Sequence, residues 1–163
     1  MGAFLELVAQ FDVWVDGGWG VDALLGKQTR PHSDLDLIIG DTTRAALEAH
    51  LLHARFKKIP VDGIVFEAPD GLRIDIHLVS FDDAGWGSFD VGDGREWPFP
   101  PSAFAGRGRI DGRNVRCLSP EAQVHCHGQG YVPQPKDLAD MQALQQQFGL
   151  VLPLSLGVRV RGR

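Results

Sequence analysis

The segment Asp34-Leu35-Asp36-Leu37-Ile38-Ile39 places two carboxylates at the start of an apolar run. Side chains alternate between the two faces of a β-strand, so Asp34 and Asp36 share one face and the leucines pack on the other. Two carboxylates this close repel each other, and a cation between them relieves the repulsion. Such oxygen ligands suit Mg²⁺, which also takes phosphate oxygens. The segment therefore predicts a strand with a metal site, and a solvent-facing acidic strand is the simpler alternative.

A glycine-rich turn precedes this strand. Residues Asp16-Gly17-Gly18-Trp19-Gly20 lie between the β-like run 13–15 and a helical stretch over 19–25 that ends at Gly26. Glycines at a helix N-terminus let backbone N–H groups approach a phosphate closely. The same residues also fit an ordinary tight turn between a strand and a helix, so the pattern indicates a phosphate site only together with its neighbours.

A third carboxylate lies on a later strand, over residues 72–78. Alternation puts Arg73, Asp75 and His77 on one face and Ile74, Ile76 and Leu78 on the other. Asp75 is then placed to be a third metal ligand or a general base, and partial burial would raise its pKa toward a useful range. His77 shares its face, where it would tune Asp75 or contact a substrate. An ordinary amphipathic strand explains the same alternation.

Hydrophobic spacing and turn residues divide the rest of the chain into short elements. We expect helices over 4–11, 41–55, 120–128 and 135–148, strands over 61–66 and 72–81, and a hairpin at 110–115. The region 85–112 is rich in Gly and Pro and predicts hairpins and loops rather than helix. Early strands followed by late helices predict an α+β (mixed α/β) fold. We expect a single domain over 1–163, with a catalytic sheet core and hairpins over 1–116, C-terminal helices over 117–150 and a tail over 151–163.

Composition excludes several classes of protein. With 16 basic against 21 acidic residues the net charge is −5, which argues against an extended nucleic-acid surface. The longest apolar stretch, 149–158, is interrupted by Pro153 and is too short to cross a membrane. The N-terminus has no secretory pattern, so we expect a cytoplasmic protein with reduced thiols at Cys117 and Cys126. These cysteines and the nearby histidines fit no common zinc spacing.

Taken together, a phosphate turn, a carboxylate pair and a third carboxylate are the groups that metal-assisted phosphoryl or nucleotidyl transfer requires. One or two Mg²⁺ ions would neutralise a nucleoside triphosphate. Asp75 would take the proton from an acceptor hydroxyl while pyrophosphate leaves. Catalysis of this kind is mostly positioning and charge stabilisation.

Residues 16–36 also resemble a known signature, because Gly-Gly-Trp, Thr-Arg-x-His and Asp-x-Asp occur in that order. The signature is that of small antibiotic nucleotidyltransferases, namely lincosamide nucleotidyltransferases and aminoglycoside 2″-adenylyltransferases of the DNA-polymerase-β-like superfamily. Later segments that resemble the lincosamide enzymes are 74–77 followed by Asp82-Asp83, then 117–123, Gly130-Tyr131, Asp137 and Asp140.

The resemblance implies a nucleotidyltransferase fold, a short mixed sheet flanked by helices with a C-terminal helical part against the cleft. It also implies roles for individual residues. The implied Mg²⁺ ligands and catalytic carboxylates are Asp34, Asp36 and Asp75, the last being the base. The implied nucleotide-binding residues are Gly17, Gly18, Arg30, His32 and Lys136. Lys136 would reach the triphosphate, although a solvated side chain before a helix is the alternative.

The acceptor is expected to contact His77, Trp86, Glu96 and Trp97. Trp86, Trp97 and Phe99 would form an apolar wall or pack in the core. The acids Asp82, Asp83, Asp90, Asp93 and Glu96 would attract an amine-bearing acceptor.

The leading hypothesis is transfer of AMP from ATP, or of a nucleoside monophosphate from another triphosphate, to a hydroxyl of a small molecule, first a lincosamide and second an aminoglycoside. A partner protein or RNA as acceptor, and a non-catalytic nucleotide-binding relative, remain alternatives. A homodimer is compatible with so small an enzyme.

Overall fold

The computed structural model describes residues 1–90, 95–129 and 132–153. Asp93, the Gly130-Tyr131 pair and most of the expected tail, from 154 onward, lie outside the described residues. Within these ranges, no helix is both long and apolar enough to cross a membrane.

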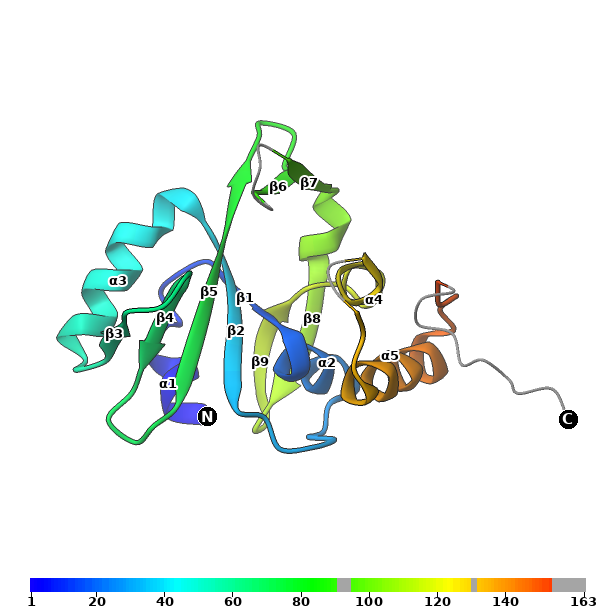
Figure 1. Ribbon diagram of the computed structural model, residues 1–163, viewed down its shortest axis with the longest axis horizontal. Helices are drawn as coiled ribbons and strands as arrows, with labels where there is room; N and C mark the ends of the chain where they lie inside the picture. The colour runs from blue at the N-terminus through cyan, green and yellow to red at the C-terminus, as the bar shows by residue number, and fades with distance from the viewer. Residues whose placement is uncertain (91–94, 130–131, 154–163) are drawn as a thin grey trace, which may run out of the picture.

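One mixed sheet organises the chain, with its strands in the order β3-β4-β5-β2-β1-β9-β8 (Figure 1). A hairpin of β6 and β7 extends from β5. Strands β2 and β5 run parallel, as do β1 and β9, and the other described pairs are antiparallel. The strands are β1 (Val13–Asp16), β2 (Asp34–Gly40), β3 (Lys57–Ile59), β4 (Ile64–Glu67), β5 (Arg73–Phe81), β6 (Gly87–Asp90), β7 (Glu96–Phe99), β8 (Gly106–Ile110) and β9 (Arg113–Cys117).

Helices pack on both sides of this sheet. They are α1 (Gly2–Leu7), α2 (Gly17–Leu25), α3 (Arg44–His53), α4 (Pro120–Gln129) and α5 (Pro135–Phe148), with short 3₁₀ helices at Asp41–Thr43 and Pro101–Ala105. In Figure 1, α1 and α3 gather beside β3 and β4, whereas α2, α4 and α5 lie together on the side of β8 and β9. The α+β fold is thus confirmed.

The two faces of the sheet follow from the alternation of side chains along each strand. Leu35, Leu37 and Ile39 of β2 lie on one face and join a core that includes residues of α1 and α3. Ile38 of β2 and Val79 of β5 lie on the opposite face and join a second core with residues of α4 and the 101–105 helix. At one end of this second face the residues are acidic instead of apolar, and the candidate site lies at that end.

Several local elements differ from the sequence prediction, among them β3, which was not predicted. The first helix ends at Leu7 instead of Phe11, and the strand expected from Val61 starts at Ile64 because Gly63 forms a turn with φ of 101°. A 3₁₀ helix occurs at Pro101–Ala105, where only hairpins and loops were expected. Proline at the start of a helix loses no hydrogen bond and already has a helical φ, which explains this short helix within a Pro-rich region.

Candidate active site

Three neighbouring strands bring three carboxylates together on the second face of the sheet. The parallel register of β2 and β5 sets Asp36 opposite Asp75. The antiparallel register of β1 and β2 sets Asp16 opposite Asp36. Side chains paired in this way across adjacent strands come within contact distance. The register therefore builds a row of acids, Asp16, Asp36 and Asp75, which we call the cavity acids.

A group of metal-ligating side chains lies within this row. Asp36, Asp75 and His77 each offer one ligand atom, and these three atoms lie within 4.8 Å of one another. The Nε2 atom of His77 is 3.5 Å from a carboxylate oxygen of Asp36. The carboxylates of Asp36 and Asp75 are oxygen ligands that suit the Mg²⁺ expected from the sequence, whereas the imidazole of His77 is a ligand type that suits softer metals.

The electrostatics of the group fit a cation as well. Burial raises the pKa of Asp75, and the nearby carboxylates of Asp36 and Asp34 raise it further. Burial and the charge of Asp36 also raise the pKa of Asp16. Desolvation opposes the charged form of His77, but the hydrogen bond with Asp36 and the surrounding carboxylates outweigh it and raise the pKa of His77 to about 9. Mutual repulsion of this kind is what a bound divalent cation relieves.

Asp34 has a different setting from Asp36. It shares the face of Asp36, as the strand period predicts, but it is exposed at the start of β2 and lies opposite Arg73. The hydroxyl of Ser33 donates a hydrogen bond to Asp34 at 3.2 Å. Asp34 contributes negative charge near Asp75 without belonging to the group of three ligand atoms.

A cavity of about 390 Å³ opens beside this row of acids, and its lining includes Asp16 and Asp36 but not Asp75. Asp16, Gly17, Asp36 and His77 line one end of it. The remaining lining residues come from the β6–β7 hairpin and from α4, and they are Phe89, Asp90, Trp97, Phe99, Cys126 and His127. The site therefore combines an acidic end with a wall of aromatic rings.

The Gly-Gly turn is required by the packing around it. Gly17 starts α2 with φ of 57°, and a Cβ atom there would overlap the carboxylate of Asp36. A Cβ atom on Gly18 would overlap the side chains of His32 and Arg30. Both glycines thus let side chains from the following segment close over the N-terminus of α2.

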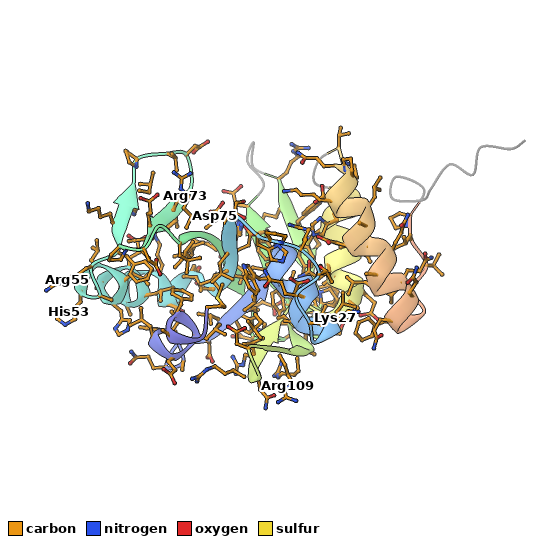
Figure 2. All side chains as sticks on the ribbon, turned by 90° about the horizontal axis from the view of Figure 1, so that it is seen from below. Lys27, His53, Arg55, Arg73, Asp75 and Arg109 are labelled. Carbon is orange, nitrogen blue, oxygen red and sulfur yellow. The ribbon has the colours of Figure 1, made fainter. Side chains whose placement is uncertain are left out.

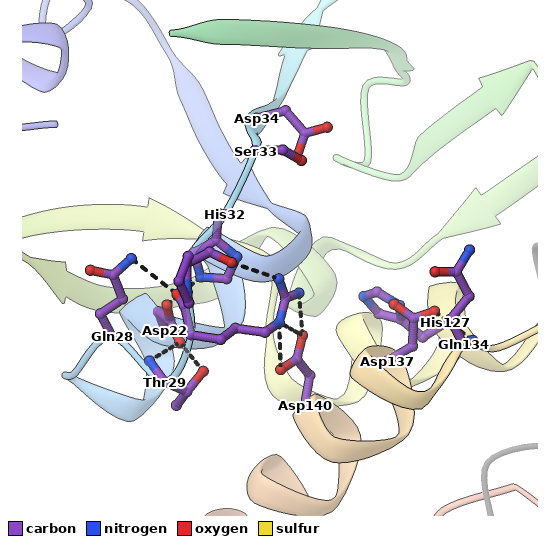
Figure 3. A network of polar contacts seen from close by, with 12 residues as sticks. Asp22, Gln28, Thr29, His32, Ser33, Asp34, His127, Gln134, Asp137 and Asp140 are labelled. Carbon is purple, nitrogen blue, oxygen red and sulfur yellow. Dashed lines mark hydrogen bonds and ion pairs between the residues drawn. The ribbon is translucent and has the colours of Figure 1, made fainter.

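Arg30 and His32 each pair with a buried acid, and Figure 3 labels these acids, Asp22 and Asp140. Arg30 donates to both oxygens of Asp140, with a shortest distance of 2.7 Å. His32 hydrogen-bonds to Asp22, which also accepts the backbone N–H of Thr29 at 2.9 Å and its hydroxyl at 2.6 Å. Asp22 and Asp140 are 2% and 4% exposed, and we call them the paired acids. The structure brings Arg30 and His32 to the start of α2, but in contact with protein carboxylates.

The other residues expected at the site have three different placements. His77 and Trp97 line the cavity. Trp86 and Glu96 line a separate groove, where Glu96 accepts a hydrogen bond from Ser88 at 2.7 Å. Lys136 is exposed at the start of α5 and does not line the cavity. The strand period explains the division, because Trp97 and Glu96 are neighbours on β7 and point to opposite faces.

Sequence reasoning missed several residues of the site. The sequence pattern places Asp16 in the glycine turn, although its position at the end of a β-like run is a usable signal for a site residue. Phe89 and His127 had no local signal of a role. His127 lies 3.8 Å from Asp137, whose carboxylate accepts the backbone N–H of Gln134 at 2.8 Å. That arrangement depends on how α4 packs against α5.

Comparison with known proteins agrees with this geometry. A family model described as aminoglycoside-2″-adenylyltransferase matches residues 5–144. A 2″-aminoglycoside nucleotidyltransferase of Escherichia coli is 33% identical over 116 residues, which are 69% of this chain and 60% of that protein. The match thus spans less than two thirds of that relative. A lincosamide resistance protein of Staphylococcus haemolyticus is 28% identical over 143 residues, which are 81% of this chain and 83% of that protein.

Two solved structures share the fold over most of the chain. A lincosamide antibiotic adenylyltransferase with bound lincomycin has a TM-score of 0.73 and 25% identity, and the match covers 88% of this chain and 93% of that one. An aminoglycoside nucleotidyltransferase in complex with adenylyl-2″-tobramycin has a TM-score of 0.69 and 25% identity, with 89% and 85% covered. Because the family model extends over most of the chain and the fold agrees, this chain belongs to the aminoglycoside-2″-adenylyltransferase family.

Proposed function

We propose that this protein transfers AMP from ATP to a hydroxyl group of a small-molecule antibiotic, with a lincosamide as the first choice of acceptor. The observation that carries the proposal is the approach of Asp36 and Asp75, whose carboxylate oxygens lie within 4.8 Å of each other, beside an aromatic-walled cavity that Asp36 lines. Family membership supports the same reaction.

Asp36 and Asp75 are the residues that would hold Mg²⁺, with Asp34 on the same face beside them. When bound, one or two such ions neutralise the triphosphate and its leaving pyrophosphate. The chain itself supplies the N-terminus of α2, where backbone N–H groups and the helix dipole favour an anion. Arg30 and His32 contribute by shaping that N-terminus.

Asp75 is the group suited to accept a proton. Its carboxylate is half-buried, and burial raises its pKa, which brings it closer to that of a useful general base. The oxygen of the acceptor hydroxyl forms a bond to the α-phosphorus of ATP, and the bond from that phosphorus to pyrophosphate breaks. The hydroxyl proton passes to Asp75, so the products are the adenylylated acceptor and pyrophosphate.

The aromatic wall favours an acceptor with an apolar face. Phe89 and Trp97 are paired across the β6–β7 hairpin, and Phe99 follows on the same strand as Trp97. Rings of this kind bury apolar area better than they match a sugar that carries many amines and hydroxyls. An aminoglycoside is the second candidate, which the description of the family model favours.

The test is a transfer reaction with a mixed acceptor panel. Purified protein is incubated with Mg²⁺, ATP or GTP and a panel of lincomycin, clindamycin, tobramycin and kanamycin, and mass spectrometry detects an added nucleoside monophosphate. We expect adenylylated lincomycin, and none with Asp36→Asn. If tobramycin is the only drug modified, the acceptor is an aminoglycoside and not a lincosamide. If the protein binds Mg²⁺ and ATP but modifies none of the four drugs, the acceptor is a metabolite, a protein or an RNA instead. If the protein does not bind the nucleotide, the proposal is wrong.

A further inference from the structure

His127 is a cavity residue without a part in the proposed chemistry. It lies near the end of α4, is 9% exposed and lines the cavity together with Asp16 and Gly17. Gln123 is one turn earlier on the same face of α4, and it packs so closely against α2 that a Cβ atom on Gly20 would overlap it. This face of α4 therefore lies along the first turns of α2, and it brings His127 to the cavity at the start of that helix.

An acid of α5 holds the imidazole ring of His127. Figure 3 shows Asp137 beside His127, and its carboxylate is 3% exposed and lies 3.8 Å from Nδ1 of the ring. The other carboxylate oxygen of Asp137 accepts the backbone N–H of Gln134 in the capping box that starts α5. Asp137 is thereby fixed, and it fixes the edge of the ring that carries Nδ1. The second ring nitrogen, Nε2, can donate to a ligand in the cavity.

The cavity has few groups that bind an anion. Among the described residues that line it there is no Lys or Arg, and only two side chains, His77 and His127, can carry a positive charge. His77 belongs to the metal-ligating group and forms a hydrogen bond with Asp36. Burial and Asp36 raise the pKa of Asp16, and the charges of His77 and His127 act in the opposite direction. His127 is therefore a cationic group close to the acids but outside the metal-ligating group.

The cavity also limits the course of a bound triphosphate. The α-phosphorus must lie beside Asp36 and Asp75, because the metal and the base are there. From that point the β- and γ-phosphates extend either toward the aromatic wall or toward the start of α2. The faces of aromatic rings carry partial negative charge, whereas the N-terminus of a helix attracts anions. The triphosphate therefore passes Gly17, and His127 is the positively charged side chain beside that path.

We propose that His127 binds the β- and γ-phosphates of the nucleotide, and that Asp137 is the residue that positions it. This inference rests on the proposed function and adds a residue of α4 to the nucleotide site. A donor at this place holds phosphate oxygens that the carboxylates would repel. It also stabilises the negative charge that grows on pyrophosphate as it leaves.

The experiment measures nucleotide binding by calorimetry in the presence of Mg²⁺. The ligands are α,β-methylene-ATP, which cannot release pyrophosphate, and AMP, which lacks the β- and γ-phosphates. His127→Asn has no donor at the position of Nε2, so it should weaken binding of the analogue about 10- to 100-fold and leave the affinity for AMP within about twofold. His127→Gln places an N–H near the position of Nε2 and should recover part of the affinity for the analogue.

Two further variants make the comparison specific. Asp137→Asn can still accept the N–H of Gln134, so α5 keeps its start, and only a smaller part of the affinity for the analogue should be lost. The matched control is His53→Asn, which should bind both ligands like the parent. His53 is exposed at the end of α3, and Figure 2 shows it far from Asp75.

Two results would overturn the inference. One is equal affinity of the parent and His127→Asn for α,β-methylene-ATP. The other is an equal loss of affinity for AMP, which would show that the ring serves the nucleoside or the fold. If His127→Asn does not fold, NMR of the parent with ¹⁵N-labelled histidine decides instead. The ring signals of His127, assigned with His127→Gln, should then shift more with the analogue than with AMP, and equal shifts would contradict the inference.

Transfer is measured separately from binding. If the parent binds the analogue but adenylylates no acceptor, the proposed function fails and the variants still decide on His127. If the parent and His127→Asn bind the analogue alike and both transfer AMP, only the inference on His127 fails. A parent that binds no analogue overturns both.

Discussion

The cavity acids and the paired acids are two groups of aspartates with opposite surroundings. Each paired acid is almost fully buried and accepts hydrogen bonds from groups of the same chain, Asp22 from Thr29 and Asp140 from Arg30. The cavity acids are half-buried and lie beside one another, so burial and like charge raise the pKa of Asp16 and Asp75. A buried carboxylate with donors holds structure, whereas carboxylates that face one another at a cavity favour a cation.

The comparison teaches that the number of acids does not identify a site. The partners of each acid decide its role. Both groups lie within one stretch of sequence from Asp16 to Asp36, apart from Asp75 and Asp140. They separate only when their contacts are known.

The largest expected effect is on activity, from a change in the cavity acids. Asp75→Asn should lower the rate of AMP transfer by about 10²- to 10⁴-fold, because the amide cannot accept the hydroxyl proton. The melting temperature should stay the same or rise, since burial disfavours the charged form of Asp75 more than the attraction to His77 favours it. Initial rates by mass spectrometry and a thermal melt measure the two quantities. Near-full activity of the variant would place the base elsewhere.

The second effect is on stability, from a change in the paired acids. Asp140→Ala should lower the free energy of unfolding by about 2 kcal/mol, because Arg30 loses its charged partner between two segments far apart in sequence. Urea denaturation measures the change, and Asp140→Asn should recover part of it. A variant that is fully stable but no longer binds ATP would show that Asp140 serves the nucleotide.

The third effect is smaller: stabilisation by Mg²⁺ should depend on the cavity acids and not on the paired acids. Mg²⁺ at ten times its dissociation constant should stabilise the parent by about 1.4 kcal/mol. Asp36→Asn should show no such stabilisation in a thermal melt, whereas Asp140→Ala should keep it. An equal response of the parent and Asp36→Asn would contradict the assignment of the cavity acids as the metal site.

The smallest effect is expected for an acid outside both groups. Glu67 pairs with Arg73 at 3.1 Å on the exposed surface of the sheet. Exposed ion pairs contribute little, so Glu67→Gln should change the free energy of unfolding by less than about 0.5 kcal/mol and leave the transfer rate unchanged. A clear loss of activity would extend the site to Glu67 at the end of β4.

Much of the fold and part of the site follow from local rules. The ends of α2 and α5 at Gly26 and Gly149 were predicted, and both glycines have the left-handed conformation that ends a helix. The elements that were misplaced, such as the start of β4, are short and depend on turns. For the site, the sequence patterns pointed to Asp36, Asp75, His77 and Trp97. They also pointed to Trp86 and Glu96, which the structure places in a separate groove.

The sequence by itself determined which side chains share a face of each strand. The alternation of β2 and β5 places Asp36 with Asp34, and Asp75 with His77, because the period of two is a property of the extended backbone alone. The tertiary structure decided which of these faces meet. The register of β1, β2 and β5 aligns the three cavity acids, and the packing of α5 against α2 brings Asp140 to Arg30, 110 residues away in sequence. Such contacts depend on how the whole chain closes around its cores, and no local pattern encodes them.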